Sequence, residues 1–140
     1  MKPRVAKAII YTPDGYLLNL RDNLDGFIGA GQWDMWGGAI ESGESAIQAC
    51  EREVKEEIGL ALAFKPLFSL YGIAVFYVHT SPKPSQLVLG EGAAYAVLRF
   101  DRALRAKNVE PFTTLSILYH HFHTCKGRAL VYSPQRGEYV

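Results

Sequence analysis

The stretch GGAIESGESAIQACEREVKEEIGL, residues 37–60, decides the fold of this chain. Ser45 and Gln48 have the spacing of a capping box, in which the first residue caps a helix and the second bonds back to it. Gly59 is suited to end a helix, because glycine adopts the left-handed conformation without steric cost. The pattern therefore predicts a helix over residues 46–58.

Carboxylates crowd one edge of this predicted helix. At about 100° per residue, its apolar side chains fall within a stripe roughly 80° wide that should face the core. The stripe consists of Ile47, Cys50, Val54 and Ile58. Glu53 and Glu57 lie together at the edge of the stripe, Glu56 lies further round the same side, and Glu51 projects away. Like charges at this spacing destabilise a helix by roughly a few tenths of a kcal/mol per pair, so the crowding indicates either a solvated face or a bound cation.

The same stretch matches a longer pattern. Gly38, Glu44 and residues 52–60 fit G-x5-E-x7-R-E-U-x-E-E-x-G-U, with U an aliphatic residue, at every defined position. The pattern specifies nine residues over 23 positions, which makes it far more specific than a lone glycine-rich loop. It resembles the signature of the Nudix hydrolases, and we name residues 38–60 the box. A merely solvated face would have to produce Gly38, Glu44 and Gly59 by coincidence.

The resemblance implies a fold and an activity. The fold is an α/β/α sandwich of the α+β kind, with a mixed central sheet, the box helix on one face and a C-terminal helix on the other. The activity is Mg²⁺-dependent hydrolysis of a nucleoside diphosphate linked to another group, with Mn²⁺ as a substitute. A (deoxy)nucleoside triphosphate, cleaved to monophosphate and pyrophosphate, is the leading substrate class. Nucleotide sugars, dinucleoside polyphosphates and a nucleotide-binding module without turnover remain the alternatives.

The resemblance also assigns roles to residues of the box. The implied metal ligands are Glu53, Glu56, Glu57 and the backbone of Gly37. Such oxygen donors suit Mg²⁺, which proteins usually hold by one or two carboxylates with waters and substrate phosphates. Glu53 is also a candidate general base. Arg52 is expected to orient the carboxylates and to pair with Glu44. Gly38, Glu44 and Gly59 are the structural positions.

Further site candidates lie outside the box. Many family members use an additional glutamate as base or ligand, and Glu91, in LGEGAAY, is the best-placed one here; a loop carboxylate without such a role is equally open. Arg21 can contact a terminal phosphate or lie on the surface. Tyr77 falls where diadenosine polyphosphate hydrolases often carry a tyrosine. Three aromatic residues can stack on a base or fill the core, and these are Phe27, Trp33 and Trp36.

The rest of the chain predicts strands and one further long helix. The predicted strands are residues 5–11 and 16–21, which form a hairpin, and residues 67–80 and 93–100, with Gly72 at a bulge or kink. Residues 22–36 have the composition of a binding loop. Residues 101–106 suggest a short helix.

A second long helix is predicted near the C-terminus. Residues 111–125 begin with proline and carry an apolar set at helical spacing, which predicts that the helix packs on the sheet. That set is Leu115, Leu118, Tyr119 and Phe122. Surface or structural roles are favoured over a metal site for His120, His121 and His123, because no fourth ligand is evident. Residues 126–140 suggest an edge strand or a loose tail.

The composition and net charge limit the kinds of binding partner that we expect. The 140 residues predict a single domain, and 49% hydrophobic against 21% charged residues is a globular balance. A net charge of +1 gives no reason to expect duplex nucleic acid, a capped RNA or an anionic membrane, so a small nucleotide is the expected partner and a homodimer stays open. Cys50 and Cys125 are too few for a disulfide framework, and no stretch suggests a signal peptide or a membrane span, so a cytoplasmic location is expected.

Overall fold

The structure is a computed structural model that describes residues 2–21, 31–90, 94–124 and 132–139. Its central sheet comprises β1 (Val5–Thr12), β2 (Gly15–Leu20), β3 (Trp33–Asp34), β4 (Trp36–Ala39), β5 (Lys65–Leu70), β6 (Ile73–His79) and β7 (Ala94–Leu98). The helices are α1 (Ala46–Ile58), α2 (Phe100–Arg105) and α3 (Pro111–Thr124), with a short 3-10 turn at Pro84–Gln86. A separate two-stranded sheet pairs β8 (Tyr132–Ser133) with β9 (Glu138–Tyr139).

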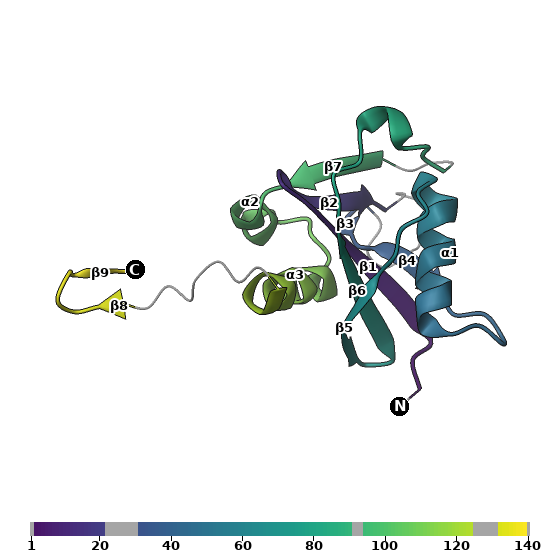
Figure 1. Ribbon diagram of the computed structural model, residues 1–140, viewed down its shortest axis with the longest axis horizontal. Helices are drawn as coiled ribbons and strands as arrows, with labels where there is room; N and C mark the ends of the chain where they lie inside the picture. The colour runs from purple at the N-terminus through teal and green to yellow at the C-terminus, as the bar shows by residue number, and fades with distance from the viewer. Residues whose placement is uncertain (1, 22–30, 91–93, 125–131, 140) are drawn as a thin grey trace.

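The sheet is mixed and lies between two helical layers. The strand order is β3-β2-β1-β6-β5, with β4 paired to β1 and β7 paired to β2. β1 runs parallel to β6 and antiparallel to β2 and β4, which take successive parts of the same edge of β1. α1 covers one face of the sheet, while α2 and α3 cover the other (Figure 1). The expected α/β/α sandwich is therefore confirmed.

α1 has the predicted bounds and caps. The Ser45 hydroxyl accepts a hydrogen bond from the Gln48 N–H, and the Ser45 N–H donates to the Gln48 side chain, so the capping box is complete. Gly59 ends the helix with φ 73°, in the left-handed region. Ala49, Cys50, Val54 and Ile58 are the buried residues of the helix. These local features hold the glutamates at the edge of the core, as the sequence predicts.

α3 exists as predicted, but a different face of it packs on the sheet. Its buried residues are Thr113, Ser116, Ile117 and His120. The predicted packing of the apolar set is wrong, since Leu115 is 44% exposed, Tyr119 43% and Phe122 77%. The helix contains no Asp, Glu, Lys or Arg, so its sequence does not distinguish a charged outer face from an apolar inner one. The buried polar residues are tolerated because they find hydrogen-bond partners.

Three smaller predictions also need correction. The loop predicted over residues 22–36 ends earlier in the structure, because β3 and the start of β4 occupy its last residues. These strands are too short to show an alternating pattern in the sequence. Gly72 is part of the tight turn between β5 and β6, with φ 54° at Tyr71 and 76° at Gly72. The irregularity in this hairpin lies instead between Pro66 and Phe68. The C-terminal strands form their own sheet and do not extend the edge of the central one.

The described part of the structure contains no candidate membrane span. Within the ranges that it describes, every helix is too short or too polar to cross a bilayer.

Candidate active site

Two glycines of β4 bring the sheet into direct contact with the carboxylates of α1. The Gly37 N–H donates a hydrogen bond to Glu57 Oε1 over 2.7 Å. A Cβ on Gly38 would lie 2.7 Å from the carboxyl carbon of Glu53, which is closer than real Cβ contacts allow. Gly37 has φ 124°, and a side chain there would overlap the carbonyl oxygen of Ala6 on β1. Gly37 therefore requires glycine, whereas a side chain at Gly38 would displace the Glu53 carboxylate that lies against it.

Arg52 ties the loop before α1 to the helix. Its Nε and Nη2 donate to the two oxygens of Glu44, over 2.7 and 3.0 Å, in the two-pronged geometry of a guanidinium–carboxylate pair. Nη2 also donates to the Ala39 carbonyl over 3.0 Å. The bonds from Arg52, helped by the Glu41 N–H, lower the pKa of Glu44 to about 2. The predicted pairing of Arg52 with Glu44 is thus present in the structure.

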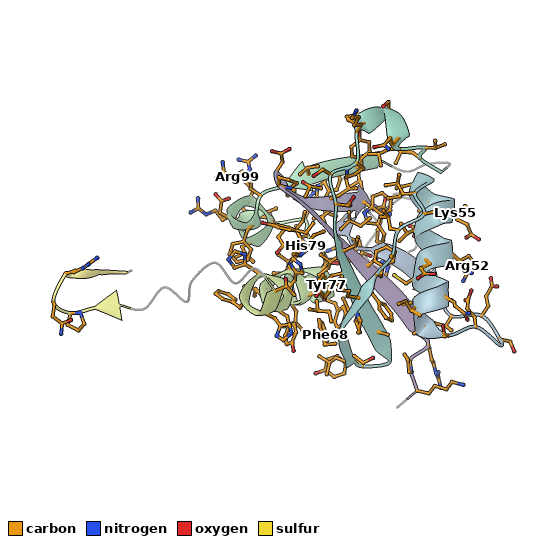
Figure 2. The ribbon with its side chains drawn as sticks, viewed as in Figure 1. Arg52, Lys55, Phe68, Tyr77, His79 and Arg99 are labelled. Atoms are coloured by element: carbon orange, nitrogen blue, oxygen red, sulfur yellow. The ribbon has the colours of Figure 1, made fainter. Side chains whose placement is uncertain are left out.

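The same guanidinium also contacts two of the metal-ligand candidates. Arg52 Nη1 donates to Glu53 Oε1 over 3.0 Å and to Glu56 Oε2 over 3.4 Å. Arg52 projects from α1 on the side of the molecule away from α3 (Figure 2). Hydrogen bonds to Glu44 and then to Glu53 raise the pKa of Arg52, so its charge is retained. Arg52 therefore orients Glu53 without being able to act as a proton donor near neutral pH.

Glu57 is a carboxyl whose surroundings disfavour its charge. Burial raises its pKa to about 7, and the nearby charges of Glu53 and Asp34 act in the same direction. The Gly37 N–H and the Lys7 ammonium oppose the shift. Without a cation, about half of the Glu57 side chains would carry a proton at neutral pH. A buried carboxyl beside another carboxylate is the electrostatic condition that a bound divalent cation relieves.

The carboxylates fit a hard cation chemically, but they are turned toward internal partners. No group of three His, Cys, Asp or Glu side chains in the described part of the chain is placed to hold one metal ion. Glu53 instead bonds Arg52, Glu57 bonds the Gly37 N–H, and the Glu56 side chain is 59% exposed. The donor set consists of carboxylate oxygens, which suits Mg²⁺ or Mn²⁺ and not a thiol- or imidazole-seeking ion.

A second charged cluster, not found from the sequence, adjoins this site. Asp34 is 3% exposed and accepts hydrogen bonds from the Met35 N–H over 2.7 Å and the Thr113 hydroxyl over 2.6 Å. Lys7 Nζ lies 3.5 Å and Arg21 Nη1 3.6 Å from its other oxygen. Lys7 pairs with Gly37 across the β1–β4 ladder. In the sequence, the one sign of this cluster is that Lys7 lies inside an apolar central strand. A lysine in such a strand needs a negative charge, from a buried side chain or a ligand, to pair with.

The family model described as NUDIX domain matches residues 1–114. This chain belongs to the Nudix family. It is accordingly a hydrolase of pyrophosphate bonds in nucleoside diphosphate-linked compounds. No curated protein matches the chain significantly.

Solved structures share the fold of this Nudix domain. The MutT protein from Methanosarcina mazei Go1 is 20% identical, with a TM-score of 0.70 over 88% of this chain and 97% of that one. A MutT NUDIX hydrolase from Burkholderia pseudomallei is 21% identical, with a TM-score of 0.68 over 85% of this chain and 98% of that one. A NUDIX family hydrolase from Clostridium perfringens is 18% identical, with a TM-score of 0.62 over 84% and 95%. At these identities the likeness shows the fold alone.

The structure does not bring the two tryptophans of this Nudix domain to an open site. Trp36 is 0% exposed, packs in the core under α1, and donates its indole N–H to the Leu17 carbonyl over 2.9 Å. Of the two roles open to Trp36, base stacking or core packing, it takes the core position, because its ring faces are covered. Trp33 is partly buried on the α3 side, where its backbone bonds to Asn108 and Glu110 and anchors the start of α3.

The other predicted substrate residues are scattered. Tyr77 lies on the face of the sheet that α3 covers, away from the box carboxylates (Figure 2), so it does not join them. Arg21 is beside Asp34, as described above. Phe27 and Glu91 lie outside the described residues. The residue before Glu91 is Gly90, whose N–H donates to the Glu57 carbonyl over 2.9 Å at the end of α1.

Proposed function

We propose that this Nudix domain is a Mg²⁺-dependent pyrophosphohydrolase with a (deoxy)nucleoside triphosphate as its leading substrate class. Glu53, Glu56, Glu57 and the backbone of Gly37 would hold the cation, with Mn²⁺ able to replace Mg²⁺. The supporting observation is the close packing of two carboxyls against the β4 glycines, one of them with a pKa raised to about 7. This is an arrangement that costs stability unless a cation binds there.

Each residue has a role that follows from its contacts. A bound divalent cation supplies charge neutralisation of the pyrophosphate oxygens and a lower pKa for bound water. Glu53 is the proposed general base, and the Arg52 hydrogen bond of 3.0 Å holds its carboxylate in one orientation. Glu44 in turn holds Arg52 in place. A chain of hydrogen bonds therefore runs from Glu44 in the loop, through Arg52, to the proposed base Glu53. Glu57 completes the carboxylate set from the next turn of the helix.

Two cations beside the site support a substrate with several phosphates. Lys7 and Arg21 both lie within 3.6 Å of Asp34, and Lys7 also acts electrostatically on Glu57. The Arg21 side chain is 37% exposed and can turn to a terminal phosphate. Nucleotide sugars and dinucleoside polyphosphates present the same anhydride and remain the alternatives. A nucleotide-binding role without turnover is disfavoured by the complete set of box carboxylates.

Glu91 remains a proposed second base or ligand. The described residue before it, Gly90, donates a hydrogen bond to the backbone carbonyl of Glu57. Glu91→Gln should then lower kcat while leaving the Tm of the metal-free protein unchanged. Unchanged turnover would assign no catalytic role to this residue.

One screen tests the function. Purified protein with Mg²⁺ is offered nucleoside triphosphates, nucleotide sugars, dinucleoside polyphosphates and coenzyme A, and released phosphate or pyrophosphate is measured. We expect Glu53→Gln to reduce the confirmed activity by roughly 100-fold or more. Glu51→Gln is the matched control, because Glu51 is exposed on the same helix, and it should retain wild-type rates. Binding of nucleotide without product for any compound would favour the non-catalytic alternative.

The cytoplasmic location and the homodimer stay predictions. Size-exclusion chromatography with light scattering measures the latter directly.

A further inference from the structure

Two histidines from distant parts of the chain meet on the face of the sheet opposite α1. His79 is the last residue of β6, and His120 lies near the C-terminal end of α3. Their Nε2 atoms are 2.9 Å apart, with ring planes at 74°. His79 and the neighbouring Tyr77 lie between the sheet and α3 (Figure 2). The proposed hydrolase chemistry uses neither histidine.

The contact between the two Nε2 atoms requires one hydrogen atom between them, which a neutral imidazole can supply. A neutral imidazole has one N–H donor and one lone-pair acceptor, so two facing nitrogens are compatible only if one of them carries a proton. The second nitrogen of His120, Nδ1, lies 2.8 Å from the Tyr16 hydroxyl. When that hydroxyl accepts from Nδ1–H, the His120 Nε2 presents a lone pair toward His79. This is the outer hydrogen bond that usually orients a metal-binding histidine.

The surroundings keep both rings neutral and hold them in place. Burial lowers the pKa of His120 to about 4, and the charges of His79, His121 and His123 add to this. Burial and the Lys65 charge lower the pKa of His79. At neutral pH, protons therefore compete weakly for the two lone pairs. The Tyr11 ring packs at 5.2 Å from both imidazoles, which limits their rotation.

We propose that His79 and His120 form a two-histidine binding site for a divalent transition-metal ion such as Zn²⁺ or Ni²⁺, separate from the carboxylate site on α1. Imidazole nitrogens favour these ions, whereas Mg²⁺ favours oxygen. With bonds of about 2.0–2.1 Å, two nitrogens on one ion lie roughly 2.9 Å apart at 90° and roughly 3.3 Å apart in a tetrahedron. The observed separation of 2.9 Å matches the value for two ligands at 90° on one ion.

The site opens to solvent on the His79 side only, since His120 is 0% exposed, and it is incomplete. A cavity of about 580 Å³ borders His79 and is lined also by Lys65, Tyr77 and His123. Within the described ranges no third histidine, cysteine or carboxylate is placed to complete a metal site. Water or a small ligand would take the remaining positions from the cavity. The affinity should therefore be lower than that of a structural zinc site with four protein ligands.

Calorimetric titration with Ni²⁺ and with Zn²⁺ tests this site. The titrations use saturating Mg²⁺ to occupy the carboxylates and a Cys125→Ser background to remove that thiol. The parent protein should bind one ion, and His79→Gln should weaken binding at least tenfold. His123→Gln is the matched control, since His123 lines the same cavity, and it should change the Kd less than twofold. No binding by the parent protein, or an equal loss in both variants, would overturn the proposal.

A second measurement needs no variant at the pair. In ¹H–¹⁵N spectra of the imidazole nitrogens of the Cys125→Ser protein, Zn²⁺ should shift the Nε2 resonances of His79 and His120 together. Those of His121 and His123 should stay in place. Shifts confined to His121 or His123 would assign the ion elsewhere and refute the pair. A circular dichroism spectrum and Tm of His79→Gln confirm that its lost binding does not reflect unfolding.

Discussion

Glu57→Gln should stabilise the metal-free protein while removing its activity. In the folded protein the pKa of Glu57 is about 7, against an ordinary value of 4.5, because the carboxyl is buried beside Glu53. At about 1.4 kcal/mol for each tenfold change, this difference corresponds to about 3 kcal/mol. Glutamine is uncharged, nearly the same shape, and can still accept the Gly37 N–H.

The sign follows from proton binding. Between pH 4.5 and 7 the folded protein binds this proton more tightly than the unfolded chain does. The stability contribution of Glu57 is therefore fully present below pH 4.5 and is lost as the pH rises through 7. The variant escapes this loss. In EDTA, the difference in unfolding free energy between Glu57→Gln and wild type should grow by about 3 kcal/mol in favour of the variant between pH 5 and pH 8.5.

Urea unfolding at pH 5 and pH 8.5, in EDTA, measures this difference directly. Glu51→Gln, on the exposed side of the same helix, should show no such pH dependence relative to wild type. With Mg²⁺ at pH 8.5, wild type should gain stability and Glu57→Gln should gain much less. The raised pKa would be refuted if the difference in unfolding free energy between Glu57→Gln and wild type were the same at the two pH values. Equal Mg²⁺ stabilisation would refute a cation at this carboxyl.

Three further variants probe the same site. Gly38→Ala should lower kcat by roughly 100-fold, because its Cβ displaces the carboxylate that lies 2.7 Å away, whereas Gly90→Ala, with no contact closer than 3.6 Å, should be tolerated in steady-state kinetics. Arg52→Lys should lower kcat roughly 10- to 100-fold with little change in KM, since lysine lacks the planar fork; wild-type kcat would contradict an orienting role. Lys7→Met removes a charge that lowers the pKa of Glu57, so the acid limb of the kcat/KM profile should move to higher pH. If the acid limb stayed at the same pH, the ionisation of Glu57 would not control the activity.

The best predictions from the sequence rest on short-range interactions. The bounds of α1, its capping box and its glycine cap depend on atoms within four residues of each other. The carboxylate cluster follows from the helical period alone. The Arg52–Glu44 pair is eight residues apart, and the loop before the helix is too short to separate them. Such features depend on contacts between residues close together in the sequence.

What the sequence did not decide is which face of an element turns inward. α3 has apolar residues on two sides and no charge on either, so its period predicted a helix but selected the wrong face. Trp36 stands where strand pairing directs its ring into the core under α1. Neither choice is local, because each depends on the register of a strand or on the packing of another layer.

The sequence by itself determined the family, the box helix and the set of carboxylates, because these depend on spacing along one segment. Only the tertiary structure decided what those carboxylates touch. The β1–β4 register places Gly37 against Glu57 and Lys7 near both, and α3 crosses the far face so that His120 meets His79. A raised pKa, a buried ion pair and a histidine pair all require groups far apart in the chain to share a space with little water.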